Sequence, residues 1–131
     1  MMSKRNTNLK GRKIKDKFLP LFYSLLHHRD FKSLSSRATK LLIDIGAPYN
    51  GYNNGDLAAT MSLMKERGWN SNDQLQKAKN ELLAKNLIII TRQGGRKRPT
   101  LYALTWLPID DCNGKLDIES TTKAPRNFSL E

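Results

Sequence analysis

The fold is decided by residues 71–106, which read SNDQLQKAKNELLAKNLIIITRQGGRKRPTLYALTW. The first part predicts a helix, because Ser71 stands three residues ahead of Gln74 in the capping-box pattern. Apolar residues then recur at helical spacing and define one buried face, formed by Leu75, Ala78, Leu82 and Leu83. Asn86, a residue type that tolerates the left-handed conformation, is expected to end this helix.

A two-stranded hairpin is expected to follow the helix. Residues 87–91, LIIIT, are the most β-branched run of the chain and predict a strand. Residues 92–99, RQGGRKRP, cannot continue it, because they hold two glycines, a proline and four cations with no acid. Residues 100–106, TLYALTW, predict a second strand. Helix, strand, basic loop and strand follow one another as in the second half of a winged helix, where the basic loop is the wing.

Two upstream helices would complete a helix-turn-helix unit. Residues 34–46 predict the first, with Ser35 or Ser36 as N-cap. Its buried stripe would consist of Ala38, Leu41, Leu42 and Ile45. Residues 56–67 predict the second, and Trp69 is expected to anchor the turn that leads into the helix at Ser71. A capped, polar-faced second helix is the arrangement that offers a helix to the major groove of DNA.

Shorter elements are expected elsewhere. Residues 18–31 suit a short extra helix packed on the core, with His27 and His28 as surface or partly buried structural residues. Residues 51–52 are expected as a third strand. Tyr49 and Tyr52 would either pack at the edge of the sheet or stack on bases.

The expected fold class is therefore α+β, mainly α: a three-helix core, a small antiparallel β-sheet wing and an extra N-terminal helix. Residues 1–17 are expected to form a disordered basic arm and residues 18–110 the winged-helix domain. Residues 111–131 would form an extended C-terminal tail that packs on the domain or on a second copy. Residues 116–118 alternate in polarity, which indicates a short edge strand.

The charge of the chain indicates a polyanionic partner. The formal net charge is +11 in 131 residues, and the cations gather in residues 1–17 and 92–98. No apolar run approaches the roughly 20 residues of a membrane span, so no membrane association is expected. Cys112 is the only cysteine and forms no internal disulfide. A cytoplasmic protein is expected.

Enzymatic motifs are missing from the sequence. There is no Gly-rich phosphate loop ahead of a helix, no nucleophile elbow and no cluster of carboxylates of nuclease type. We therefore expect no catalytic residues, no metal site and no cofactor.

The candidate binding residues lie on the helix after Ser71 and in the basic loop. On the helix, amides can bond adenine edges and lysines can contact flanking phosphates. In the loop, arginine forks suit phosphates, and a glycine-rich tip suits a narrow minor groove. The helix residues are Asn72, Gln76, Lys77, Lys79 and Asn80. The loop residues are Arg92, Arg96, Lys97 and Arg98, which are expected to project together beyond the sheet.

The order of elements over residues 34–106 resembles the winged helix-turn-helix superfamily. Four runs carry a narrower likeness, to short bacterial helix-turn-helix proteins of prophages and other mobile elements: NGDL at 54–57, RGWNS at 67–71, TRQGG at 91–95 and LYALTW at 101–106. The resemblance implies DNA binding in a bacterial or phage setting. It implies nothing about the target sequence.

The expected function is non-catalytic binding of double-stranded DNA, in transcription regulation or in replication of a mobile element. The helix would enter the major groove, and a palindromic target would require a homodimer. Two alternatives remain open. The domain could instead dock an acidic partner protein, or the tyrosines and the basic arm could bind RNA.

Overall fold

The computed structural model describes residues 16–131, so the predicted arm lies almost entirely outside the described residues. Within them, the chain folds as α+β, with five α-helices and one three-stranded antiparallel sheet. The helices are α1 (Tyr23–Leu26), α2 (Arg29–Lys32), α3 (Ser36–Gly46), α4 (Met61–Lys65) and α5 (Asn72–Ala84). The strands are β1 (Leu57–Ala58), β2 (Ile88–Arg92) and β3 (Leu101–Leu104). Two 3₁₀ turns follow, η1 (Cys112–Gly114) and η2 (Phe128–Leu130).

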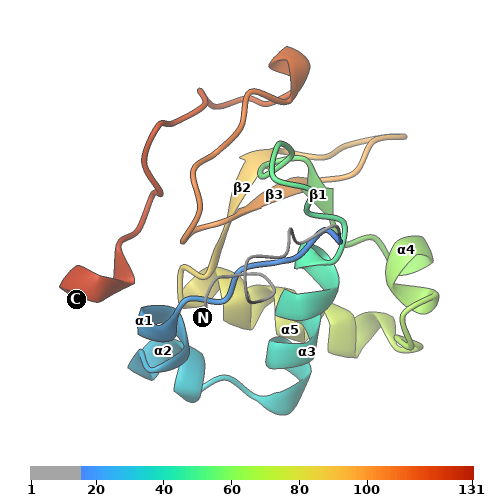
Figure 1. Cartoon of the computed structure of the whole chain (residues 1–131). Coiled ribbons are helices and arrows are strands. Elements are labelled where there is room, and N and C mark those ends of the chain that lie inside the picture. The colour runs from blue at the N-terminus through green and yellow to red at the C-terminus, as the bar shows by residue number, and fades with distance from the viewer. Residues whose placement is uncertain (1–15) are drawn as a thin grey trace.

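The core lies between the sheet and the packed pair α3 and α5 (Figure 1). The stripe predicted for α3 is confirmed, because all four of its residues are fully buried. On α5, Leu75, Ala78 and Leu82 are buried, while Leu83 is half-buried at the edge of the helix. The predicted helix ends are also confirmed. Ser71 Oγ accepts the Gln74 N–H at 3.2 Å, and Asn86 adopts φ 54° directly after the last turn.

The strand order is β1-β3-β2, so β3 lies at the centre of the sheet and β2 is an edge strand. β2 pairs with β3 from Ile88 opposite Leu104, and a bulge shifts the register between Ile90 and Arg92. All four residues of β3 are buried. The predicted hairpin is confirmed, but its bounds differ. β2 is shifted by one residue from the expected 87–91, so Arg92 lies in the strand and not in the loop as predicted, and β3 is shorter than the expected 100–106.

The helix predicted over residues 56–67 is present as α4 but is much shorter than expected, and the prediction is wrong for its first part. Leu57 and Ala58 instead pair with Tyr102 and Leu101 as β1, and only Met61–Lys65 is helical. The side chain of Thr60 accepts the Leu63 N–H at 3.3 Å and caps the helix there. Backbone pairing at an otherwise open edge of β3 prevails over the helical apolar spacing of this segment.

A third strand does pair with the hairpin, but it is β1 (Leu57–Ala58) and not residues 51–52, so the expected position is wrong. Gly51 has φ +95° and Tyr52 is 83% exposed, so this segment is a turn and Tyr52 does not pack at the sheet edge. Tyr49 packs against the core. The single short helix expected over residues 18–31 is split into α1 and α2, because His28 Nδ1 accepts the Asp30 N–H and starts a new helix.

The C-terminal segment, residues 110–131, lies along the domain (Figure 1, orange to red). Residues 116–118 form turns, so the predicted edge strand there is wrong, although the Asp117 N–H donates to Thr91 O of β2 at 2.8 Å. The Arg126 N–H donates to Thr105 O, and Phe128 enters the core. The Arg126 guanidinium bonds the carboxylates of Asp30 and Glu131, which ties the segment to α2.

Asn54 connects the turn before β1 to the end of β3. Its side chain is fully buried, and its Nδ2 donates to the carbonyl oxygens of Leu104, Leu107 and Pro108 at 2.9–3.1 Å. Its Oδ1 accepts the Leu104 N–H at 2.8 Å. One amide therefore satisfies four backbone groups where no other element of the sheet reaches them.

Candidate nucleic-acid interface

The polar face of α5 is exposed, as predicted, with one exception. Asn72, Gln76, Lys77 and Asn80 are exposed, whereas Lys79 is half-buried. Gln76 Nε2 donates to Asn80 Oδ1 at 3.2 Å, so the two amides already lie in register along the helix. Lys77 forms an exposed i,i+4 ion pair with Asp73 at 3.2 Å, which contributes little to stability but leaves the ammonium accessible.

The hairpin tip, residues 93–99, closes beyond the strands in an ordered two-residue turn. Gly95 and Arg98 form an isolated antiparallel bridge, with Arg96 and Lys97 between them. Gly94 is required here: a Cβ would lie 2.4 Å from Thr100 N, and the Gly94 N–H donates to Thr100 Oγ1 at 3.0 Å. Gly94 therefore allows a compact tip, with Arg96 and Lys97 at its turn.

Three of the four predicted loop cations lie at this tip and one does not. Arg96 and Lys97 are exposed and form no hydrogen bond or ion pair with residues 16–131. Arg98 is exposed, and its guanidinium donates to Gln93 O at 3.4 Å. The expectation that Arg92 also projects outward is wrong, because it is half-buried and its Nη2 donates to Pro99 O at 3.2 Å. Arg92 Nε is buried without a partner in the described part of the chain. Arg92 thus braces the base of the tip.

A groove of about 340 Å³ separates α5 from the hairpin, and we call it the helix–hairpin groove. None of its lining residues is acidic, and Lys79 is its one cation. The lining residues are Ala59, Thr60, Gln76, Lys79, Asn80, Leu83, Ile90, Gln93, Thr100 and Tyr102. The groove brings the amides of α5 and the base of the hairpin tip to the edges of one surface. The sequence analysis missed four of these residues, because tertiary packing creates the groove and leaves no signal for it in the sequence. They are Thr60, Gln93, Thr100 and Tyr102.

The turn between α4 and α5 is held by Asp44 of α3, a residue that the sequence did not single out. Its carboxylate is 4% exposed and accepts from Lys40 Nζ at 2.6 Å, Arg67 Nε at 2.8 Å and Trp69 Nε1 at 2.8 Å. Trp69 is buried between the helices, as predicted. The sequence did carry one signal for this role. An acidic residue on the buried face of a predicted helix needs hydrogen-bond partners within the fold. Asp44 thereby fixes where α5 begins.

Asp44 should make the stability of the fold depend on acid pH. Burial alone would raise the pKa of Asp44, but the hydrogen bonds from Lys40, Arg67 and Trp69 outweigh it, so its pKa lies below the usual value. A depressed pKa stabilises the fold above the unfolded-state pKa, roughly 4, and this contribution is lost as the pH falls through the lower folded-state pKa. Urea unfolding followed by tryptophan fluorescence should show Asp44→Asn clearly less stable than wild type at about pH 7, with the gap narrowing below about pH 4.

The matched control for that comparison is Asp73→Asn, which changes an exposed carboxylate in a surface pair. It should alter stability by less than about 0.5 kcal/mol at either pH. A gap between wild type and Asp44→Asn that stays constant with pH would contradict the role given to the Asp44 charge.

The acidic side chain nearest the middle of α5 points away from the groove. Glu81 accepts the Ser35 N–H at 2.7 Å and the Ser35 hydroxyl at 2.8 Å, at the first residue before α3. Ser35 Oγ in turn accepts the Ala38 N–H at 3.1 Å as the N-cap of α3. Glu81 is thus a contact between two helices, and its charge is held at the N-terminus of α3, where the helix dipole favours it.

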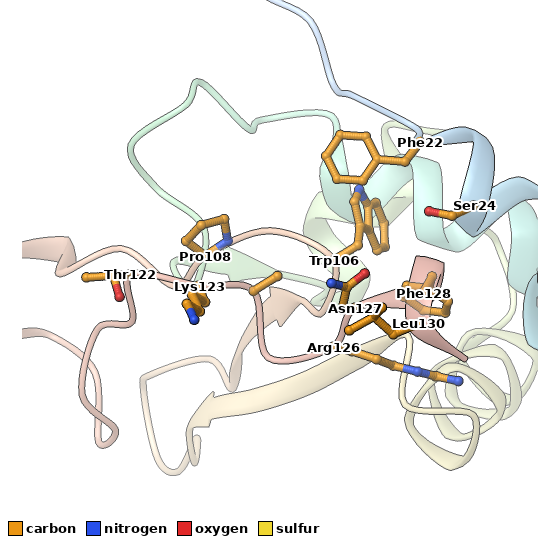
Figure 2. Close-up of a pocket in the computed structure, with 11 residues that line it drawn as sticks. Phe22, Ser24, Trp106, Pro108, Thr122, Lys123, Arg126, Asn127, Phe128 and Leu130 are labelled. Carbon is orange, nitrogen blue, oxygen red and sulfur yellow. The ribbon is translucent and has the colours of Figure 1, made fainter.

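A second hollow lies between α1 and the C-terminal segment, away from the hairpin tip (Figure 2). It measures about 550 Å³, and its walls combine apolar side chains with polar ones that include Lys123 and Arg126. Figure 2 shows Phe22 and Trp106 on one side of it, with Phe128 and Leu130 on another. Phe22 is 44% exposed and Leu130 is 83% exposed.

Within residues 16–131, no helix has both the length and the apolar character needed to cross a membrane. The same residues bring together no group of three or more His, Cys, Asp or Glu side chains that could hold a metal ion. Burial and the neighbouring Asp56 and Asp110 raise the pKa of the Cys112 thiol, so the thiol is a poor nucleophile. Comparison with protein-family models, curated proteins and solved structures found no match to this chain.

Proposed function

We propose that this chain is a winged-helix protein that binds double-stranded DNA without catalysis. In this arrangement α3, α4 and α5 are the helix-turn-helix core, and the hairpin tip is the wing. α5 enters the major groove, and the hairpin tip contacts the backbone or the adjacent minor groove. The biological role would be regulation of transcription or assistance in replication of a phage or mobile element.

One observation carries the proposal: the exposed amides Gln76 and Asn80 line an acid-free groove whose opposite wall is the base of the hairpin tip, and that tip carries two exposed cations, Arg96 and Lys97, without a partner in residues 16–131. Amides arranged in register on a helix suit base edges, and fixed cations suit phosphates. The charge of residues 1–17 adds to the attraction, since the chain carries +11 overall. With about 6–8 phosphates neutralised, log K should fall with log salt at a slope of roughly −5 to −7.

The proposal is tested by selection from a random pool of duplex DNA at two salt concentrations, with sequencing of the retained molecules. Enrichment of a motif that survives the higher salt would establish a sequence-specific regulator, and the symmetry of the motif would give the oligomeric state. Binding that disappears at the higher salt and enriches nothing would indicate an architectural role. Absence of binding at both concentrations would overturn the proposal.

Base recognition by α5 gives a prediction for this assay. Gln76→Ala with Asn80→Ala should weaken the sequence preference at the base pairs that α5 faces. The free-energy difference between the preferred base and the others should fall by about 1–3 kcal/mol for each lost bidentate contact. The salt dependence should change little, because no charge is removed. The measurement is the enriched motif of the double variant beside that of wild type.

The control for this prediction is Gln93→Ala, at the base of the hairpin tip, which should leave the motif intact. An unchanged motif in the Gln76→Ala, Asn80→Ala variant would show that another element selects the bases.

A second candidate function is favoured by the hollow of Figure 2, whose exposed apolar side chains Phe22 and Leu130 suit a protein partner better than a nucleic acid. Here the domain would dock an acidic protein through the hairpin tip and an apolar segment of that protein through the hollow. Salt-sensitive binding to an acidic protein without binding to duplex DNA would support this function over the first.

A further inference from the structure

The helix–hairpin groove contains two polar side chains that its own fold does not satisfy. Lys79 is half-buried, and its amine forms no hydrogen bond or ion pair with residues 16–131. Tyr102 is 5% exposed and lines the groove, and its hydroxyl forms no hydrogen bond in the same part of the chain. Arg92 Nε is the one described side-chain atom both buried and unpaired, so the Tyr102 hydroxyl retains access to the groove.

Both groups are donors that lack an acceptor. Burial lowers the pKa of the Lys79 ammonium, because the ammonium loses part of its hydration there. Burial raises the pKa of the Tyr102 phenol, so the hydroxyl stays protonated and can donate. No carboxylate lines the groove, so neither donor has an acidic acceptor there. The groove thus offers two donors, and no competing carboxylate, to an anion that arrives from outside.

The geometry of duplex DNA supplies such an anion, provided that the proposed function holds. Adjacent major and minor grooves are separated by one sugar–phosphate backbone. If α5 lies in the major groove and the hairpin tip in the neighbouring minor groove, that backbone must pass between them. The helix–hairpin groove occupies this position, with α5 residues Gln76 and Asn80 on one side and Gln93 and Thr100 of the hairpin on the other.

We infer that the helix–hairpin groove binds a backbone phosphate of duplex DNA, with the Lys79 ammonium and the Tyr102 hydroxyl as its donors. This inference rests on the proposed function and adds to it a specific contact that no other lysine of α5 can make. Lys77 is exposed and paired with Asp73, so it serves as a peripheral charge. Lys79 is held beside the sheet, where a bound phosphate would replace the solvent that the ammonium has lost.

The test uses the full chain and a labelled mixed-sequence duplex of about 20 base pairs, with affinity measured by fluorescence anisotropy over a range of salt concentrations. Lys79→Gln should weaken binding about tenfold and make the salt slope shallower by about 0.9, the value for one phosphate. Lys79→Arg should restore the slope. Tyr102→Phe should weaken binding about three- to tenfold with the slope unchanged, because it removes a donor but no charge.

Two further comparisons separate a shared phosphate from general loss of charge. Lys32→Gln removes the same charge from α2, which lies far from the hairpin tip (Figure 1), and should change affinity less than twofold. The combined Lys79→Gln, Tyr102→Phe variant should lose less than the product of the single losses, since both donors act on one group. Thermal unfolding of each variant confirms that it is folded.

The outcomes distinguish this inference from the proposed function. If the wild type binds DNA and the affinity of Lys79→Gln equals that of Lys32→Gln, the groove contact is overturned and DNA binding stands. Equal slopes for Lys79→Gln and wild type would do the same. Absence of wild-type binding at low salt would overturn both.

Discussion

Asn54→Ala should lower the free energy of unfolding by about 3–5 kcal/mol, which is enough to unfold a marginally stable domain. The change removes four hydrogen bonds from a fully buried side chain. It leaves the carbonyl oxygens of Leu104, Leu107 and Pro108 and the Leu104 N–H without that partner. Each buried group left unsatisfied costs about 1–3 kcal/mol, and partial relaxation of the turn reduces the sum.

Urea unfolding followed by the fluorescence of Trp69 and Trp106 measures this loss. Asn53→Ala is the matched control, because Asn53 bonds Pro48 O and the Asn50 N–H in an exposed turn next to Asn54. It should cost about 1 kcal/mol or less.

Asn54→Asp should also destabilise the fold strongly near neutral pH, and part of the lost stability should return in acid. A carboxylate cannot donate to three carbonyls, whereas a protonated carboxyl can donate to one. If Asn54→Ala lowered the free energy of unfolding no more than Asn53→Ala does, Asn54 would not be the anchor of β3.

Arg96→Ala combined with Lys97→Ala should weaken DNA binding about 30- to 100-fold at low salt and make the salt slope shallower by about 1.8, for two phosphate contacts. Both side chains are exposed and unpaired within the described residues, so their removal costs no internal contact. Because Gly94 and the Gly95–Arg98 bridge shape the turn, the two cations lie next to each other and exposed at its end. Stability should change by less than about 0.5 kcal/mol.

The control removes the same two residue types from α2. Arg29→Ala with Lys32→Ala deletes one exposed arginine and one exposed lysine far from the hairpin tip (Figure 1). It should change the affinity only slightly, through the long-range field. Equal losses in the two double variants would show that net charge, rather than the hairpin tip, determines binding. Anisotropy titrations at three or more salt concentrations separate these cases.

The parts of the fold that the sequence predicted are those with local causes. α3 and α5 follow from apolar residues at helical spacing between recognisable caps, and the hairpin from a β-branched run, a glycine-rich turn and a second strand. The error at β1 has a non-local cause. Leu57 has helical neighbours in the sequence, but its backbone pairs with Tyr102, which lies far along the chain. Periodicity cannot reveal which sheet edge is left open for such a pair.

The candidate interface was predictable to a similar extent. The exposed amides of α5 and the cations of the hairpin tip could be read from their positions. The position of Arg92 could not be read from the sequence, because its guanidinium could either face a ligand or bond within the hairpin. In the structure it bonds Pro99 O. Tyr102 lies between two apolar residues of β3, Leu101 and Ala103, so the sequence alone would assign it to the core. Only the packing of α5 against the hairpin leaves its hydroxyl facing a groove.

Glu81 has a consequence for attempts to strengthen this surface by protein engineering. A common route to a more basic protein is to delete acids near the intended contact, and Glu81 on α5 is an obvious choice in the sequence. Because its carboxylate holds Ser35 at the start of α3, Glu81→Gln would loosen the helix that supports α5. The added positive field would then come with a less rigid α5. An extra cation is better introduced at an exposed position of the hairpin tip such as Gln93, whose side chain forms no hydrogen bond with the described residues.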